Sequence, residues 1–135
     1  MKKINLYVLI LVSILISCSD DDVTINPLSN SGLLGEWEIS SRGINNVSSL
    51  EALCCETIMF MEDSNINDTK GNYTFDDSNG IITNGVFTID VNNNILLYTT
   101  ENNNSYTQEY SLNSDVLEVW YFEEGDRYWT QYFKL

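Results

Sequence analysis

From Leu33 to the C-terminus, apolar and polar residues alternate with a period of two. Successive side chains of a β-strand point to opposite faces, so this period indicates strands that bury one face. The clearest case is SYTQEYSL at 105–112, where the larger side chains occupy every second position. Turn residues interrupt the alternation roughly every eight to twelve positions, which is typical of a β-sandwich or a β-barrel. The pattern predicts an all-β fold of one domain over residues 33–135.

The connections between the later segments are short: 76–80, 92–94, 101–104, 113–115 and 123–126. Short loops join antiparallel neighbours, so these strands should follow one another as an up-and-down meander. An open meander of about eight strands exposes two edges, and pairing of the last strand with the first removes both. We therefore expect a closed antiparallel barrel of about eight strands.

One longer connection, 40–55, lacks this alternation. Ser49 can cap a helical turn that continues through Glu51 and Leu53. We expect a short helical turn near residues 48–54.

Aromatic residues are concentrated in the last two predicted strands, on both faces. One face must contribute to the core. The other face either lies under a covering segment, 43–55, or exposes rings that can stack on sugars or contact a protein partner. The residues concerned are Trp120, Tyr121, Phe122, Tyr128, Trp129 and Tyr132.

The first 17 residues contain a charged region, an apolar run and a small residue, in the order that is typical of an export signal. Lys2 and Lys3 precede an uncharged run, Ile4–Ile16, which a small residue, Ser17, separates from Cys18. The run is shorter than the roughly 20 residues of a membrane-spanning helix. We predict that residues 1–17 are a cleaved signal peptide.

The segment Leu15-Ile16-Ser17-Cys18 resembles the lipobox of bacterial lipoproteins. The resemblance implies that a diacylglycerol is attached to the Cys18 thiol and that the chain is cut before this residue. Two or three acyl chains, palmitate among them, would then anchor the protein to a membrane, because stable anchoring takes more than one chain.

The chain turns acidic directly after Cys18. The run Ser19-Asp20-Asp21-Asp22 is similar to the signal that sends some Gram-negative lipoproteins to the outer face of the outer membrane. The alternative is an ordinary solvated linker. Either way, residues 18–32, which include Pro27, are predicted to be a lipidated flexible tether. The expected location is the outer membrane, with the exterior face as one alternative.

The formal net charge of the full chain is −14, and loss of Lys2 and Lys3 with the signal makes it two units more negative. Binding to nucleic-acid phosphates needs a basic face, so a nucleic-acid partner is excluded. The charge also opposes self-association, and we expect a monomer.

Two cysteines, Cys54 and Cys55, remain besides Cys18. Adjacent Cα atoms lie about 3.8 Å apart, closer than in an ordinary disulfide. Three alternatives are open: a strained disulfide between neighbours, two thiols on opposite sides of a strand, or bridges between molecules. No metal site is expected, since two thiolates without histidine supply only half of a zinc shell.

The Gly35-Glu36-Trp37 segment resembles the G-x-W motif of lipocalins. With LLGEW, CCETIMFMED, GNYTF, NGVFTID and an aromatic last strand, the chain is similar to small lipocalin-like lipoproteins of Gram-negative bacteria. The resemblance implies a β-barrel with an apolar interior. It also implies that Arg127 packs over Trp37 and closes one end of the barrel. An interior cavity would be lined by Trp37, Phe87, Tyr110 and Trp129.

No catalytic residues and no cofactor are predicted. The chain has no histidine, the most frequent acid–base group of enzymes. Carboxylate pairs such as Glu36 and Glu38 fit a solvated surface. The loop from Asp63 begins like a calcium-binding loop, but Asp68 stands where glycine is needed.

The sequence favours a non-enzymatic, lipid-anchored lipoprotein of the outer membrane or cell surface. Its barrel would hold a small apolar ligand or serve a structural role in the envelope. The alternative is a surface adhesion or glycan-binding module that uses an exposed aromatic face. An interior cavity favours the first hypothesis, whereas a packed interior with an exposed Trp120 or Tyr132 favours the second.

Overall fold

The structure is a computed structural model that describes residues 28–49 and 55–135. The predicted signal peptide, Cys18, Cys54 and most of the tether lie outside the described residues. Within the described part, no helix is long and apolar enough to cross a bilayer.

The described residues form nine β-strands. They are β1 (Gly35–Ile44), β2 (Val47–Ser48), β3 (Thr57–Glu62), β4 (Lys70–Asp76), β5 (Ile82–Asp90), β6 (Ile95–Thr100), β7 (Ser105–Asn113), β8 (Val116–Glu123) and β9 (Asp126–Lys134).

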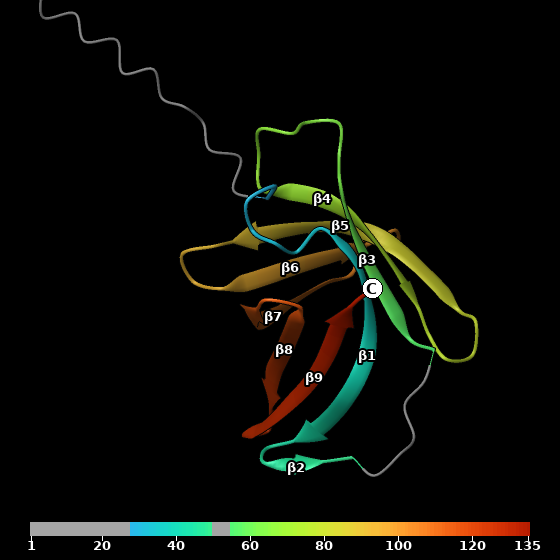
Figure 1. Ribbon diagram of the computed structural model, residues 1–135, viewed down its shortest axis with the longest axis vertical. Helices are drawn as coiled ribbons and strands as arrows, with labels where there is room; N and C mark the ends of the chain where they lie inside the picture. Colours follow the sequence, from blue (N-terminus) through green and yellow to red (C-terminus); the bar gives the residue numbers. More distant parts are fainter. Residues whose placement is uncertain (1–27, 50–54) are drawn as a thin grey trace, which may run out of the picture.

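The strands form one closed antiparallel barrel (Figure 1). From β3 to β9 each strand pairs with the next in the chain, and β9 pairs with β1. Eight strands complete the ring, and β2 adds a short hairpin to the end of β1. The predicted all-β, up-and-down barrel is confirmed. Of the helical turn predicted near residues 48–54, residues 50–54 lie outside the described part, and Ser48 belongs to β2.

β1 closes the ring by bonding on both edges. Its first half, Gly35–Glu38, pairs with β3, and β9 pairs with most of its length, from Trp37 to Ile44. A bulge between Ile39 and Ser41 shifts the β1–β9 register. Such a bulge bends a strand and increases its twist, which helps a sheet of this size to close.

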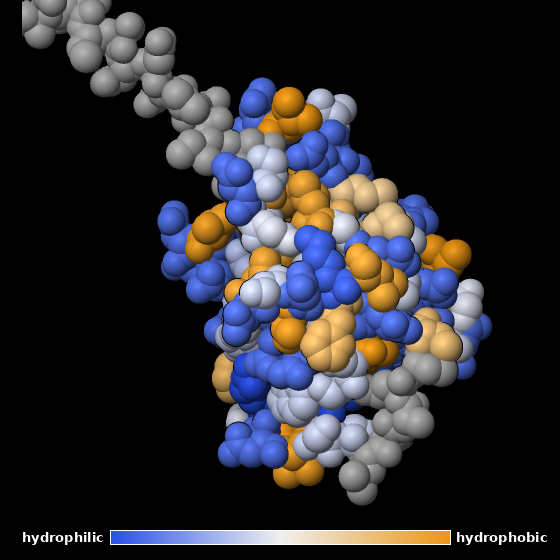
Figure 2. Space-filling view, viewed as in Figure 1, coloured by the Kyte–Doolittle hydropathy of each residue, from blue (hydrophilic) through white to orange (hydrophobic). Residues whose placement is uncertain are grey.

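The inward side chains fill one half of the barrel with aromatic and aliphatic groups. Phe60 meets Phe87 edge to face at 4.9 Å, and Tyr73 meets Tyr98 in the same way at 5.2 Å. Gly85, opposite Tyr73, leaves room for the Tyr73 ring, because a Cβ there would lie 2.7 Å from it. On the face shown in Figure 2, polar residues predominate and apolar ones are scattered between them.

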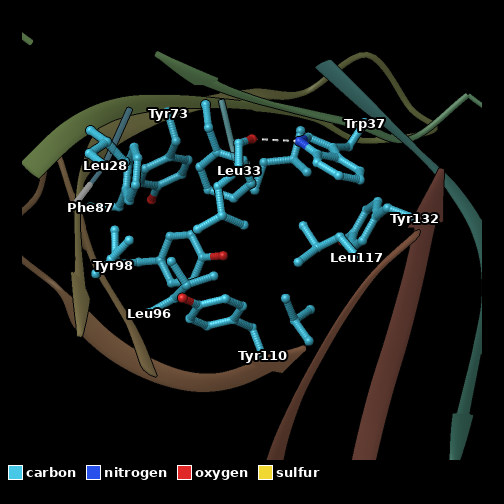
Figure 3. Packing of buried hydrophobic residues seen from close by; sticks show 14 of the residues in the cluster. Leu28, Leu33, Trp37, Tyr73, Phe87, Leu96, Tyr98, Tyr110, Leu117 and Tyr132 are labelled. Carbon is cyan, nitrogen blue, oxygen red and sulfur yellow. Dashed lines mark hydrogen bonds between the residues drawn. The ribbon is translucent and has the colours of Figure 1, made fainter. Parts of the chain in front are cut away.

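The segment before β1 plugs one end of the barrel. Leu28 and Leu33 are 1% and 0% exposed and belong to the core cluster. Trp37 Nε1 donates a hydrogen bond of 2.7 Å to the Leu33 carbonyl, drawn in Figure 3. Lys134 Nζ donates to the Gly32 carbonyl at 3.0 Å. The tether predicted over residues 18–32 is therefore too long: its last residues pack into the barrel because Leu28 finds apolar neighbours there.

The two ends of the barrel differ. The plug lies where β1 begins and β9 ends. At the opposite end, which we call the mouth, β1 and β8 end and β3 and β9 begin.

Removing a buried side chain from the plug should destabilise the whole barrel. We expect Leu33→Ala to lower the free energy of unfolding by about 3 kcal/mol, because it removes buried methyl groups and leaves a cavity. Leu97→Ala, at a side chain that is 41% exposed, should cost less than about 1 kcal/mol. Urea unfolding measures both. Equal losses for the two variants would show that the plug is not part of the cooperative core.

Candidate functional site: the barrel interior

The interior holds two adjacent pockets between the packed half and the mouth. The deep pocket has a volume of about 180 Å³ and the outer pocket about 360 Å³. Both are bordered by Gln108 and Val119, so they adjoin. Their combined size is within the usual range for small-molecule sites, which starts at about 300 Å³.

Register determines which side chains line these pockets. Leu117 pairs with Tyr132, Val119 with Thr130 and Tyr121 with Tyr128 across β8 and β9. Leu117 and Val119 are buried in the core, so the alternation of a strand puts all three pairs on the inner face. The same rule puts every tyrosine of the described residues inside: Tyr73, Tyr98, Tyr106, Tyr110, Tyr121, Tyr128 and Tyr132.

Two pairs of these tyrosines are stacked in parallel. The rings of Tyr98 and Tyr106 are 4.9 Å apart with an interplanar angle of 13°. Those of Tyr121 and Tyr128 are 5.2 Å apart at 9°. The first pair lines the deep pocket and the second the outer one. Flat aromatic surface therefore extends from the deep pocket towards the mouth.

Burial raises the pKa of four interior tyrosines, Tyr98, Tyr106, Tyr110 and Tyr132, and so favours their neutral form. Burial raises the pKa of Tyr98 well above its usual value. Burial and the nearby charge of Glu56 raise the pKa of Tyr132 to about 12, against an opposing effect of Arg42. Burial raises the pKa of Tyr106, and so does the hydroxyl of Tyr73 beside it. Neutral phenols offer both a hydrogen-bond donor and an acceptor to a ligand.

An ion pair lies in the wall where β1 separates from β3. Arg42 Nη2 donates to Glu56 Oε2 at 2.5 Å. The Glu56 side chain is only 14% exposed and that of Arg42 37%. Arg42 borders the outer pocket, and its Nε is buried without a hydrogen-bond partner among the described residues. The charge of Arg42 is thus compensated, while one donor is left over.

Three of the four predicted cavity residues lie in the interior. Trp37, Phe87 and Tyr110 belong to the core cluster, with exposures of 5% or less. They form packed core beside the pockets rather than their lining. Figure 3 shows Trp37 beside Leu33 on one side of the interior, Tyr110 on the opposite side, and Phe87 and Tyr98 next to each other between them.

The expected interior position of Trp129 is wrong. Trp129 pairs with Trp120, one residue out of phase with the inward Tyr128, so its indole lies on the outer face and only borders the outer pocket. Its Nε1 donates to the Asn45 carbonyl at 2.9 Å. The ring lies over Gly43, where a Cβ would approach it to 2.6 Å.

The expected pair of Trp37 and Arg127 is also wrong. Arg127 is near the mouth, paired with Phe122, and its guanidinium lies 4.5 Å from the centre of the Trp120 ring on the outer face. Trp37 is at the plugged end, where Lys134 Nζ lies 5.1 Å from its ring centre. Almost the full length of β9 separates the two positions, so a different cation covers Trp37.

Arg127 belongs to a polar network on the outer face. Glu118 accepts hydrogen bonds from Arg127 at 2.6 Å and from Gln131 at 2.7 Å. Burial alone would raise the pKa of Glu118, but these hydrogen bonds and the Arg127 charge together lower it. These hydrogen bonds connect β8 to β9 on the outer face, outside the cavity.

The structure leaves the cysteine alternatives open. Cys55 is exposed, with a φ of 73°, just before β3, and Cys54 lies outside the described residues. In the loop from Asp63, backbone amides donate to the carboxylates of Asp63 and Asp68, as in an ordinary polar turn. The described residues contain no group of three or more side chains suited to a metal ion.

The pocket residues missed at the sequence level are Arg42, which pairs with Glu56, and Tyr106, Tyr121 and Tyr128. A signal existed for the tyrosines, because each is an even number of positions from a buried residue of its own strand. No signal existed for the ion pair, since Arg42 and Glu56 meet only through the folding of β1 and β3.

The fold and the interior pockets are consistent with a lipocalin-like barrel. The sequence matches no protein-family model, and no curated protein is significantly similar to it.

Burial of Tyr132 should make stability fall at high pH. A folded pKa of about 12 exceeds the unfolded value of about 10. The contribution of this side chain is therefore complete below pH 10 and is lost as pH rises towards 12. We expect Tyr132→Phe to remove up to about 2 kcal/mol of that loss. Urea unfolding of both proteins from pH 8 to 12 tests this, and identical slopes above pH 10 would contradict it.

Proposed function

We propose that this protein is a lipid-anchored, lipocalin-like lipoprotein of the outer membrane or cell surface. In this proposal it binds a small, largely apolar ligand inside its barrel and catalyses no reaction. It acts as a monomer without a cofactor or a nucleic-acid partner. The observation that carries the proposal is the pair of adjoining pockets, which extend from the core to the mouth.

The lining of the pockets supports ligand binding. Apolar and aromatic side chains make up most of it, and a few polar residues stand among them: Arg42, Ser49, Gln108 and Thr130. Small-molecule sites have this composition, in which the apolar surface provides affinity and the polar groups fix orientation. The interior is not packed throughout, which favours the ligand-binding hypothesis over the glycan-binding one.

The plug supports an orientation for the anchored protein. The described chain begins at Leu28, in the plugged end. A tether from a lipidated Cys18 would therefore reach the barrel at this end. The mouth would face away from the membrane, and ligands would enter from the aqueous side.

The outer aromatic face supports the glycan-binding alternative less well. Trp120 and Trp129 pair across strands there, but Arg127 covers Trp120 and the Trp129 N–H is engaged with Asn45. Tyr132, the other candidate for an exposed platform, is 8% exposed.

Filling the pockets should abolish ligand binding. N-phenyl-1-naphthylamine, a neutral probe that fluoresces in apolar sites, should bind the purified protein. We expect Gln108→Trp to weaken binding at least about tenfold, because the indole occupies the space where the two pockets adjoin.

The matched control is Glu109→Trp, at the next residue on β7, which is exposed and faces outward. It should leave the affinity within about twofold of the wild type. Thr130→Trp is a second blocking variant should Gln108→Trp not fold, as judged by circular dichroism. Equal affinities in the blocking and control variants would refute binding inside the barrel.

Removing the lipidation site should detach the protein from membranes. Native mass spectrometry of the protein from its own membranes should show acyl chains on Cys18 and any retained ligand. Cys18→Ser should remain unacylated and move to the soluble fraction, while Cys55→Ser should stay with the membrane. Retention of Cys18→Ser in the membrane fraction would contradict the proposed anchor.

A further inference from the structure

We propose that the cavity selects a flat aromatic cation over a neutral or anionic molecule of the same shape. This inference rests on the proposed ligand-binding function, and it names the chemical class of the ligand. Its basis is a column of inward-facing pairs across β8 and β9, which ends towards the mouth in the aromatic pair Tyr121–Tyr128 and then the acidic pair Glu123–Asp126.

The two stacked tyrosine pairs, Tyr121–Tyr128 in the column and Tyr98–Tyr106 beside it, are only partly covered by the protein. Tyr121 is 41% exposed and Tyr106 is 46% exposed, although both border the pockets. Ring surface in each stacked pair is therefore left for a ligand. The face of an aromatic ring attracts a cation placed within about 6 Å of its centre, and a flat aromatic ligand can also continue the stack.

The acidic part of the column is the next inward-facing pair towards the mouth. Glu123 pairs with Asp126 two residues beyond the Tyr121–Tyr128 pair, on the same face of the strands. By the alternation of a strand, both carboxylates belong to the inner side at the rim of the mouth. Asp126 Oδ1 accepts a hydrogen bond from Asn45 Nδ2 at 2.8 Å, which holds it at the rim.

More carboxylates lie at the same end of the barrel. Asp76 ends β4 there, and the turns that connect strands carry Asp77, Glu101 and Glu124. The two glutamates are exposed and the two aspartates partly exposed, and a single such charge contributes little. Together they give the mouth a negative potential that concentrates cations and repels anions.

The interior offers an anion no uncompensated charge. Arg42 is the one basic residue that borders either pocket within the described part of the chain. Its guanidinium is already paired with Glu56 at 2.5 Å. A carboxylate ligand would have to displace Glu56 and leave it unpaired.

Binding of a cation to the ring faces does not require an ionised tyrosine. Burial raises the pKa of Tyr106 and Tyr132, so neither ring carries a charge near neutral pH. The recognition of the cation would thus use ring faces within the pockets and carboxylates only at the rim. This arrangement avoids burying an isolated charge, which is costly.

Three probes of one shape test the selection. At mildly alkaline pH, 9-aminoacridine is a cation, acridine is neutral and acridine-9-carboxylate is an anion. We expect the cation to bind at least about tenfold more tightly than acridine, a ratio typical of a partly desolvated cation–π contact. The carboxylate should bind most weakly. Fluorescence titration at physiological ionic strength measures all three.

Two sets of variants separate the contributions. Tyr121→Leu with Tyr128→Leu should reduce the cation preference about tenfold or more, because apolar volume is kept while the ring faces are lost. Tyr121→Phe with Tyr128→Phe should retain it. Glu123→Gln with Asp126→Asn should lower the affinity for 9-aminoacridine, whereas Glu62→Gln with Asp115→Asn, an equal change of charge at the plugged end, should not.

The outcomes distinguish this inference from the proposed function. If none of the probes binds, and N-phenyl-1-naphthylamine does not bind either, the proposed function fails. If acridine binds as tightly as 9-aminoacridine, the function stands and the cation preference is refuted. If the carboxylate binds most tightly, Arg42 is an anion anchor and the inference is overturned.

Discussion

The pairing of β1 with β9 is the interaction on which the rest of the structure depends. It joins residues from opposite ends of the described chain, from Trp37 with Lys134 to Ile44 with Tyr128, and it turns a meander with two free edges into a ring. Only in a closed ring do the inward side chains of all eight strands face one another. The core, the pockets and the difference between the two ends all follow from this closure, and the bulge at Ile39 and Ser41 supplies the bend that it needs.

The two ends of the closed barrel differ in how side chains fill them. At one end, Leu28 and Leu33 complete the core, and Trp37 is fixed by its hydrogen bond to the plug. At the other end the tyrosines stack in pairs without filling the space, and carboxylates follow at the rim. A barrel of eight strands is just wide enough for side chains to fill it, so a cavity in such a barrel requires that one part remain unfilled. Here the plug fills one end of the barrel, and the pockets lie in the other half, towards the mouth.

Much of the fold could be predicted because alternation is a local property. The strands around Phe87, Tyr110 and Tyr132 have a clear period of two, and the short loops between them permit only antiparallel neighbours. The errors came from relations between strands. Aromatic residues occupy both faces of the last strands, so composition could not show which face Trp129 belongs to. Arg127 lies over Trp120 and not over Trp37, because Arg127 and Trp37 are near opposite ends of β9. Leu28 follows a proline-containing polar segment, and nothing local showed that it would enter the core.

The sequence by itself determined the class of the fold, the order of the strands and the acidic character of the surface, because periodicity, loop length and charge are properties of neighbouring residues. The tertiary structure decided which tyrosines face one another, that Arg42 meets Glu56, and which end of the barrel is filled. These contacts depend on register and closure, which arise only when distant strands pair. A shift of one residue in register would exchange the inner and outer faces of a strand, and with them the lining of the cavity.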